Sequence, residues 1–161
     1  MPETRAGRAQ EPATTFDDVY RAEYPVMVRL AYVSVGSRAI AEEIVHDAFV
    51  RLHDHFATVD NPGGFLRVAV VRLCATWHKR HRMERDRLAL VAGADRSEDP
   101  EIDETWDALA TLAPERRVVV ALRYYEDLGH DEIARLLGIP ITTVRTRLWR
   151  ALRDLRKELE P

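Results

Sequence analysis

The sequence predicts an all-α protein in which two small helical domains are joined by a flexible acidic linker. Apolar residues recur at helical spacing on both sides of the chain's middle, and no segment alternates with the period of a β-strand. Between residues 95 and 107, seven acidic residues stand against one arginine, which is typical of a tether without a core of its own. The pattern of glycines and basic residues after this tether predicts a helix-turn-helix in the C-terminal domain.

Composition limits the classes of protein to which the chain can belong. Its 161 residues carry a net charge of −3, so nucleic-acid binding would have to depend on local clusters of charge. The longest apolar run, Val68–Leu73, is far too short to span a membrane, and the polar N-terminus does not resemble a secretory signal. A single cysteine, Cys74, excludes an internal disulfide framework. We therefore expect a cytoplasmic protein with no membrane insertion.

The first predicted helix has clear signals at both ends. Thr15 followed by Asp18 resembles a capping box, and Gly36 is suited to end the helix before Ser37 caps the next one. Pro25 should kink or split this helix, because proline cannot donate the hydrogen bond of a helix interior. The expected segments are a disordered tail at 1–14, an N-terminal domain at 15–90, the acidic linker at 91–104 and a C-terminal domain at 105–161.

The rest of the N-terminal domain is predicted to contain two more helices. In the second helix, apolar residues at helical spacing should face the core: Ile40, Ile44, Ala48, Phe49, Leu52 and Phe56. The turn-forming residues of Val59–Gly64 predict a loop. The third helix should run from about Gly64 to Leu90 and become strongly basic towards its end.

The C-terminal domain has the helix start and stop signals of a helix-turn-helix. Pro114 suits the first turn of its first helix, and Gly129 can cap a short second helix with Glu132 at the third position. Gly138 should end that short helix in a left-handed conformation. The side chains of the short helix that should pack inward are Ile133, Ala134, Leu136 and Leu137.

The last helix follows Pro140, is predicted to be capped by Thr142 or Thr143, and is basic and amphipathic. Its apolar stripe should comprise Val144, Leu148, Leu152, Leu155 and Leu159. Opposite that stripe lie Thr142, Thr146, Arg150 and Arg153. Threonine and arginine at the start of such a helix can reach base edges, and flanking arginines can reach phosphates. A solvated basic helix in an ordinary bundle and a helix lying on a membrane surface are the alternatives.

Neither a metal site nor catalysis is predicted. Cys74, His78 and His81 could share one helix face, but three ligands on one helix would need a fourth from elsewhere. The acidic residues of the linker lie outside any apolar-patterned element, so nothing fixes their geometry. No nucleophile–base pair and no glycine-rich phosphate loop stands out. We expect a protein that is not an enzyme and has no cofactor.

Two stretches resemble one known family. Residues 41–52, AEEIVHDAFVRL, are similar to the core-binding helix of bacterial sigma factors, and residues 112–152 resemble their region 4. Two domains with a short acidic linker resemble the extracytoplasmic-function (ECF) type, and residues 60–82 are similar to its actinobacterial branch. Two departures stand out: His46 replaces the usual glutamine, and the third helix has FLRVAVVRL in place of the common WLYRIARN pattern.

The resemblance implies a mechanism and a set of contact residues. Such proteins bind the clamp and flap regions of core RNA polymerase, recognise the −35 and −10 promoter elements and help to melt the DNA. The residues implied at the polymerase are Glu43, His46, Asp47 and Val50. Those implied at the −35 element are Thr142, Thr143, Arg145, Thr146, Arg147, Trp149, Arg150 and Arg153. Those implied at the −10 element are Asp60, Asn61, Phe65, Arg67, Arg72, Thr76, Lys79 and Arg80.

Three further points concern partners. ECF proteins are commonly held inactive by an anti-sigma factor, so such a protein is a candidate partner. One alternative is a two-domain helix-turn-helix regulator that acts without binding the polymerase core and dimerises or binds a ligand through its N-terminal helices. The other is a protein-interaction adaptor with no role at DNA.

Overall fold

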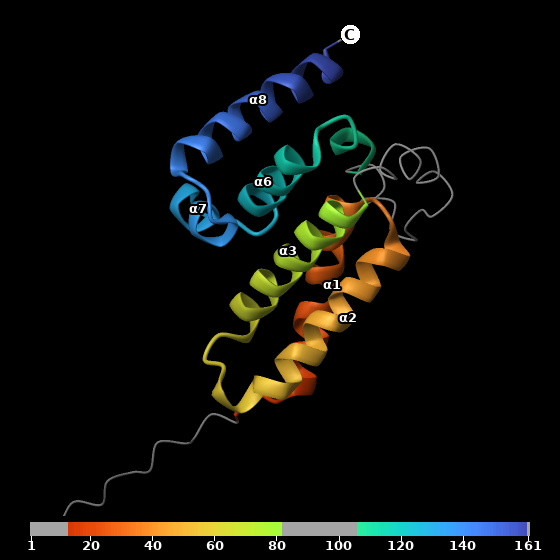
Figure 1. Ribbon diagram of the computed structural model, residues 1–161, viewed down its shortest axis with the longest axis vertical. Helices are drawn as coiled ribbons and strands as arrows, with labels where there is room; N and C mark the ends of the chain where they lie inside the picture. The colour runs from red at the N-terminus through yellow and green to blue at the C-terminus, as the bar shows by residue number, and fades with distance from the viewer. Residues whose placement is uncertain (1–12, 82–105, 161) are drawn as a thin grey trace, which may run out of the picture.

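The computed structural model describes residues 13–81 and 106–160, and every regular element within those residues is a helix (Figure 1). The predicted all-α class is thus confirmed. Most of the predicted tail, the end of the predicted third helix and the acidic linker lie outside the described residues. The elements are α1 (Phe16–Val35), α2 (Arg38–His55), the 3₁₀ turn η1 (Phe56–Thr58), α3 (Pro62–Arg80), α6 (Pro114–Tyr124), α7 (His130–Leu137) and α8 (Ile141–Leu159).

Helix α1 begins and ends as its sequence predicts. The hydroxyl of Thr15 accepts a hydrogen bond from the backbone N–H of Asp18, whose carboxylate accepts one from the N–H of Thr15 in return. Gly36 ends the helix with φ of 76°. Of the two predicted effects of Pro25, a kink or a split, the split does not occur, since α1 is one helix of 20 residues with Pro25 inside it. The buried side chains that follow, Met27 above all, hold the second half of α1 in the core despite the lost hydrogen bond.

Helices α1, α2 and α3 pack on one another as a three-helix bundle (Figure 1). Four of the six apolar residues predicted to face the core from α2 are buried, whereas Ile40 and Phe56 are half-buried at its edge. Helix α3 begins at Pro62, two residues earlier than predicted, because the side chain of Asn61 accepts a hydrogen bond from the backbone N–H of Gly64. Proline needs no donor in a first helical turn, so the predicted loop shortens by a turn.

Helices α6, α7 and α8 form the second unit, in which α8 packs on both α6 and α7. Gly138 ends α7 with φ of 65°, and Glu132 accepts a hydrogen bond from the backbone N–H of Gly129, both as predicted. The predicted threonine cap of the last helix is wrong. Pro140 is the N-cap residue, α8 begins at Ile141, and no side chain caps it.

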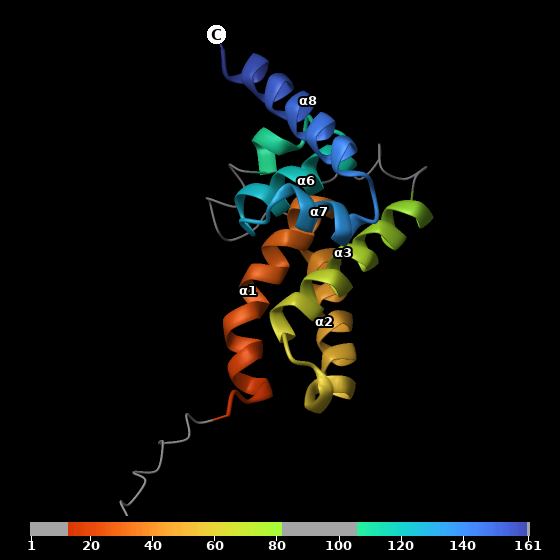
Figure 2. The same ribbon diagram turned by 90° about the vertical axis from the view of Figure 1, so that its left-hand side faces the viewer.

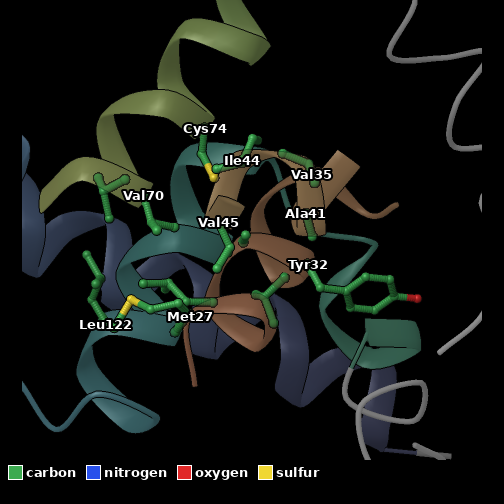
Figure 3. Close-up of a cluster of buried hydrophobic side chains, with 14 of the residues drawn as sticks. Met27, Tyr32, Val35, Ala41, Ile44, Val45, Val70, Cys74 and Leu122 are labelled. Carbon is green, nitrogen blue, oxygen red and sulfur yellow. The ribbon is translucent and has the colours of Figure 1, made fainter. Parts of the chain in front are cut away.

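The two units share a continuous core. Helix α6 lies against the C-terminal half of α1 (Figures 1 and 2). Figure 3 shows Met27 of α1, Val70 of α3 and Leu122 of α6 in one cluster of buried side chains. None of the described helices combines the length and the apolar character needed to cross a membrane.

Candidate nucleic-acid interface

Helix α8 turns one side to its own unit and the other to solvent. Val144, Leu148 and Ala151 are buried against α6 and α7. The predicted contact residues exposed on the other side are Thr142, Arg145, Thr146, Trp149, Arg150 and Arg153. The two remaining residues of the predicted set, Thr143 and Arg147, are half-buried. The predicted stripe is only partly correct, because Leu152 is 37% exposed and Leu159 is 77% exposed.

Two of the exposed side chains of α8, Arg153 and Trp149, form a cation–π contact. The guanidinium of Arg153 lies 5.1 Å from the ring centroid of Trp149, which is itself 62% exposed. Arg153 also pairs with Asp154 at 3.2 Å, and Asp154 accepts a bond of 2.6 Å from Arg116 of α6. This series of contacts orients the side chains of Arg153 and Trp149 on the surface before any ligand is bound. Less side-chain entropy is therefore lost on binding.

The predicted −10 residues divide into two groups on α3. At helical spacing, Phe65, Arg72, Thr76, Lys79 and Arg80 share one side of the helix, and all but the half-buried Phe65 are exposed. Asp60 and Asn61 are exposed at the N-terminal end of that helix.

Arg67 does not belong to that side. Its Nε and Nη2 both lie 2.9 Å from Oε2 of Glu126, which follows α6 in the second unit. The side chain of Glu126 is only 5% exposed, and that of Arg67 is 27% exposed. The structure therefore places Arg67 between the two units rather than with the other predicted −10 residues.

The predicted polymerase-binding residues form one exposed face of α2. Glu43, His46, Asp47 and Val50 follow the i, i+3, i+4, i+7 spacing of a helix face, and all four are exposed. Tyr20 of α1, which sequence reasoning missed, lies near this helix. Its ring is 40% exposed and contacts Phe49 with 4.8 Å between ring centroids. The aromatic spacing of the first helix was a signal for its position, but not for its exposure.

The candidate metal ligands are held by other contacts. Cys74 is buried, and burial raises the pKa of its thiol to about 12, although a hydrogen bond with Ser34 opposes the shift. His78 Nε2 lies 3.0 Å from the carbonyl oxygen of Ser34, while His81 stacks on Trp77 with 4.9 Å between ring centroids. Within the described residues, no three histidine, cysteine or acidic side chains converge as metal ligands would.

Comparison with known proteins identifies two matching family models and several similar sequences. The family model for sigma-70 region 2 matches residues 19–84, and the model for sigma-70 region 4 matches residues 102–155. RNA polymerase sigma-E factor of Streptomyces avermitilis is 30% identical over 90% of this chain and 85% of its own length. ECF RNA polymerase sigma factor SigE of Mycolicibacterium smegmatis is 31% identical over 93% of this chain and 63% of its own length.

A solved structure shows the same fold. The sigma factor RpoE from Bartonella quintana, solved in complex with the anti-sigma factor NepR, superimposes with a TM-score of 0.67 at 16% identity, covering 89% of this chain and 96% of that one. The chain belongs to the sigma-70 family of RNA polymerase sigma factors and is of the ECF type. It directs the initiation of transcription by RNA polymerase, as a member of a family that is not catalytic. Family membership decides against both alternatives raised by the sequence.

Proposed function

We propose that this sigma factor binds core RNA polymerase through α2, reads the −35 element with α8, and binds and melts the −10 element with α3 and the loop before it. The region 2 role belongs to residues 15–90 and the region 4 role to residues 105–161. The observation that carries the proposal is the exposed threonine and arginine face of α8, opposite its buried side. A helix-turn-helix presents such a face to the major groove.

Within α8, position separates base reading from phosphate binding. Arg145, Thr146, Trp149 and Arg150 are all exposed and are assigned to base edges, where an arginine can bond guanine through two donors. Thr142 and Thr143 lie in the first turn, close to the backbone N–H groups that a phosphate would bind. Arg147 and Arg153 are assigned to phosphates.

The −10 element is assigned to the exposed side of α3. Its arginines and lysine lie along one side of the helix, where they could bind the phosphates of a DNA strand, and Phe65 supplies an aromatic ring close in sequence to Asp60 and Asn61. Melting requires unstacked bases to be held on aromatic or apolar surfaces and the displaced strand to be held by positive charge. Both requirements are met along this one helix side.

The polymerase clamp is assigned to α2. Three polar side chains and the 48% exposed Val50 form a mixed face, and Tyr20 extends the apolar part of that surface from α1. Exposed aromatic and apolar groups ringed by polar ones are typical of protein interfaces. The flap contact belongs to the region 4 unit. We further propose that the protein acts in the cytoplasm and that an anti-sigma factor is a candidate partner, as NepR is for RpoE.

The test is transcription in vitro with core RNA polymerase and a template pool. Arg150→Ala should lower promoter-specific initiation about tenfold while core binding is retained, because one arginine–base contact is lost. Asp47→Ala should lower affinity for core polymerase and leave promoter choice unchanged.

Two exposed residues outside the assigned surfaces supply matched controls. Arg21→Ala removes an arginine from α1, and Glu158→Ala removes an acid from the end of α8. Both should behave as the unmodified protein. If core polymerase with this protein initiates at no promoter in the pool, the proposal is wrong. Equal losses in Arg21→Ala and Arg150→Ala would contradict the assignment of α8.

A further inference from the structure

A cavity of about 390 Å³ lies where the two units meet. Helices α1 and α3 supply one wall, while α6, the end of α7, the turn after it and α8 supply the other. A space of this size falls within the range of small-molecule sites, which occur preferentially at interfaces between domains. The lining residues therefore indicate which kind of molecule the cavity could hold.

The walls of the cavity are mainly aliphatic. Leu30, Val70 and Val71 are buried on the side of α1 and α3, and Val118 and Leu137 are half-buried on the other side. No aromatic ring is among the described residues that line the cavity. Apolar wall atoms that face water lose the dispersion contacts of a close-packed interior, and an apolar group that displaces loosely held water gains affinity. The walls therefore suit an aliphatic chain.

The polar groups within the wall are already bonded to one another. His78 Nε2 lies 3.0 Å from the carbonyl oxygen of Ser34 and 3.2 Å from its hydroxyl. The thiol of Cys74 also has a hydrogen bond with Ser34, and burial raises its pKa to about 12. A thiol that stays protonated is a poor nucleophile, so no covalent chemistry is expected in the cavity. The polar specificity of the cavity must come from the charges at its edge.

The charges that line the cavity are mainly positive. Lys79 of α3 and Arg147 of α8 come from different units, and Glu115 of α6 is the acidic residue among the described lining residues. Lys79 is exposed and Arg147 is half-buried, and neither forms an ion pair with another residue of 13–81 or 106–160. Two cations against one carboxylate, beside an apolar wall that excludes water, favour an anionic group.

We propose that this cavity is a binding site for a medium-chain aliphatic carboxylate, whose chain lies on the apolar walls and whose carboxylate is bound by Lys79 and Arg147. The inference goes beyond the proposed function, since neither polymerase binding nor promoter recognition requires a small molecule. It gives Lys79 and Arg147 a second role besides their assignment to DNA. A ligand that binds the folded chain also stabilises it, so the unfolding temperature rises with ligand concentration.

The experiment titrates the full chain with octanoate, below its micelle concentration, in an isothermal calorimeter. Octanol has the same chain without a charge, octylamine has the opposite charge, and both are titrated in parallel. Lys79→Gln and Arg147→Gln each remove one cation, and Ala75→Phe places a ring in the space that the exposed Ala75 borders. Arg135→Gln is the matched control, since it removes an exposed arginine of α7 that does not line the cavity.

Octanoate should bind at one site per chain, about tenfold more tightly than octanol. Lys79→Gln and Arg147→Gln should each lower octanoate affinity about fivefold and leave octanol affinity unchanged, a difference that a merely structural role would not produce. Ala75→Phe should lower both affinities at least about tenfold, because the ring occupies the space of the chain. Arg135→Gln should change neither affinity.

Three outcomes would overturn the proposal: no binding of octanoate, equal affinities for octanoate and octylamine, or equal losses in Arg135→Gln and Arg147→Gln. The last would indicate a general effect of surface charge. If Ala75→Phe unfolds by circular dichroism, the two charge variants decide the result. The titration contains neither polymerase nor DNA, so failure of the proposed function would appear separately, as absent transcription.

Discussion

Gly36 and Gly138 both end helices in the left-handed conformation, yet their surroundings differ. The φ angles are 76° and 65°, a region that residues with a Cβ adopt only at a cost. At Gly138 nothing lies within 4 Å of the position a Cβ would take, whereas at Gly36 the Trp106 ring fills it. Gly36 therefore has two roles: it ends α1, and it leaves space for the Trp106 ring at the interface between the units.

The different surroundings of Gly36 and Gly138 predict different effects of substituting each glycine with alanine. Gly138→Ala should lower the free energy of unfolding by about 1–2 kcal/mol, the cost of left-handed backbone. Gly36→Ala should cost at least about 1 kcal/mol more, because the ring must also move. Urea unfolding measures both. Combining Gly36→Ala with Trp106→Ala should remove most of the difference, and an equal cost for the two alanines in the unmodified background would contradict the contact.

At the scale of the element, α8 shows what periodicity can and cannot predict. The pattern of apolar residues correctly identified the side that faces the other helices, and Val144 and Leu148 are buried as expected. It could not show where the neighbouring helices stop covering that side. Figure 1 shows α8 continuing beyond α6 towards the C-terminus, and there Leu159 is exposed.

The packing of α7 against α8 gives the second prediction. Ile133 is fully buried, so Ile133→Ala should lower the free energy of unfolding by about 2–5 kcal/mol and weaken −35 binding, because α8 loses its support. Leu159→Ala removes the same number of atoms from a 77% exposed side chain and should change stability by less than about 0.5 kcal/mol. Thermal unfolding and duplex binding check both. A large loss in Leu159→Ala would show that the apolar stripe is used along its full length.

Helix boundaries were predictable where one local signal acted alone. The capping box at Thr15 and the left-handed glycines need only their neighbours in sequence. Errors arose where two signals competed: Asn61 with Pro62 began α3 inside a glycine-rich stretch, and Pro140 displaced the threonines as the N-cap of α8. Of the candidate contact residues, Arg67 has an ion-pair partner 59 positions away, which no local pattern could indicate.

At the scale of the whole molecule, the charges of Arg67 and Glu126 join two units that sequence patterning treats as separate. Glu126→Arg should place like charges together, move the two units apart and increase the radius of gyration of the protein. Exchanging both charges, with Arg67→Glu and Glu126→Arg, should restore compactness, since the pair is re-formed in reverse. Small-angle X-ray scattering measures the radius of gyration of each protein. A double variant as open as Glu126→Arg alone would mean that the pair does not join the units.

The sequence by itself determined the all-α class and the family, because helical periodicity and family motifs depend on residues close along the chain. It also determined which side of α8 carries the threonines and arginines. Only the tertiary structure decided that the two units close on each other, with Trp106 on Gly36 and Arg67 on Glu126. The reason is physical: such contacts depend on packing and charge between residues far apart in sequence, and no local pattern records them.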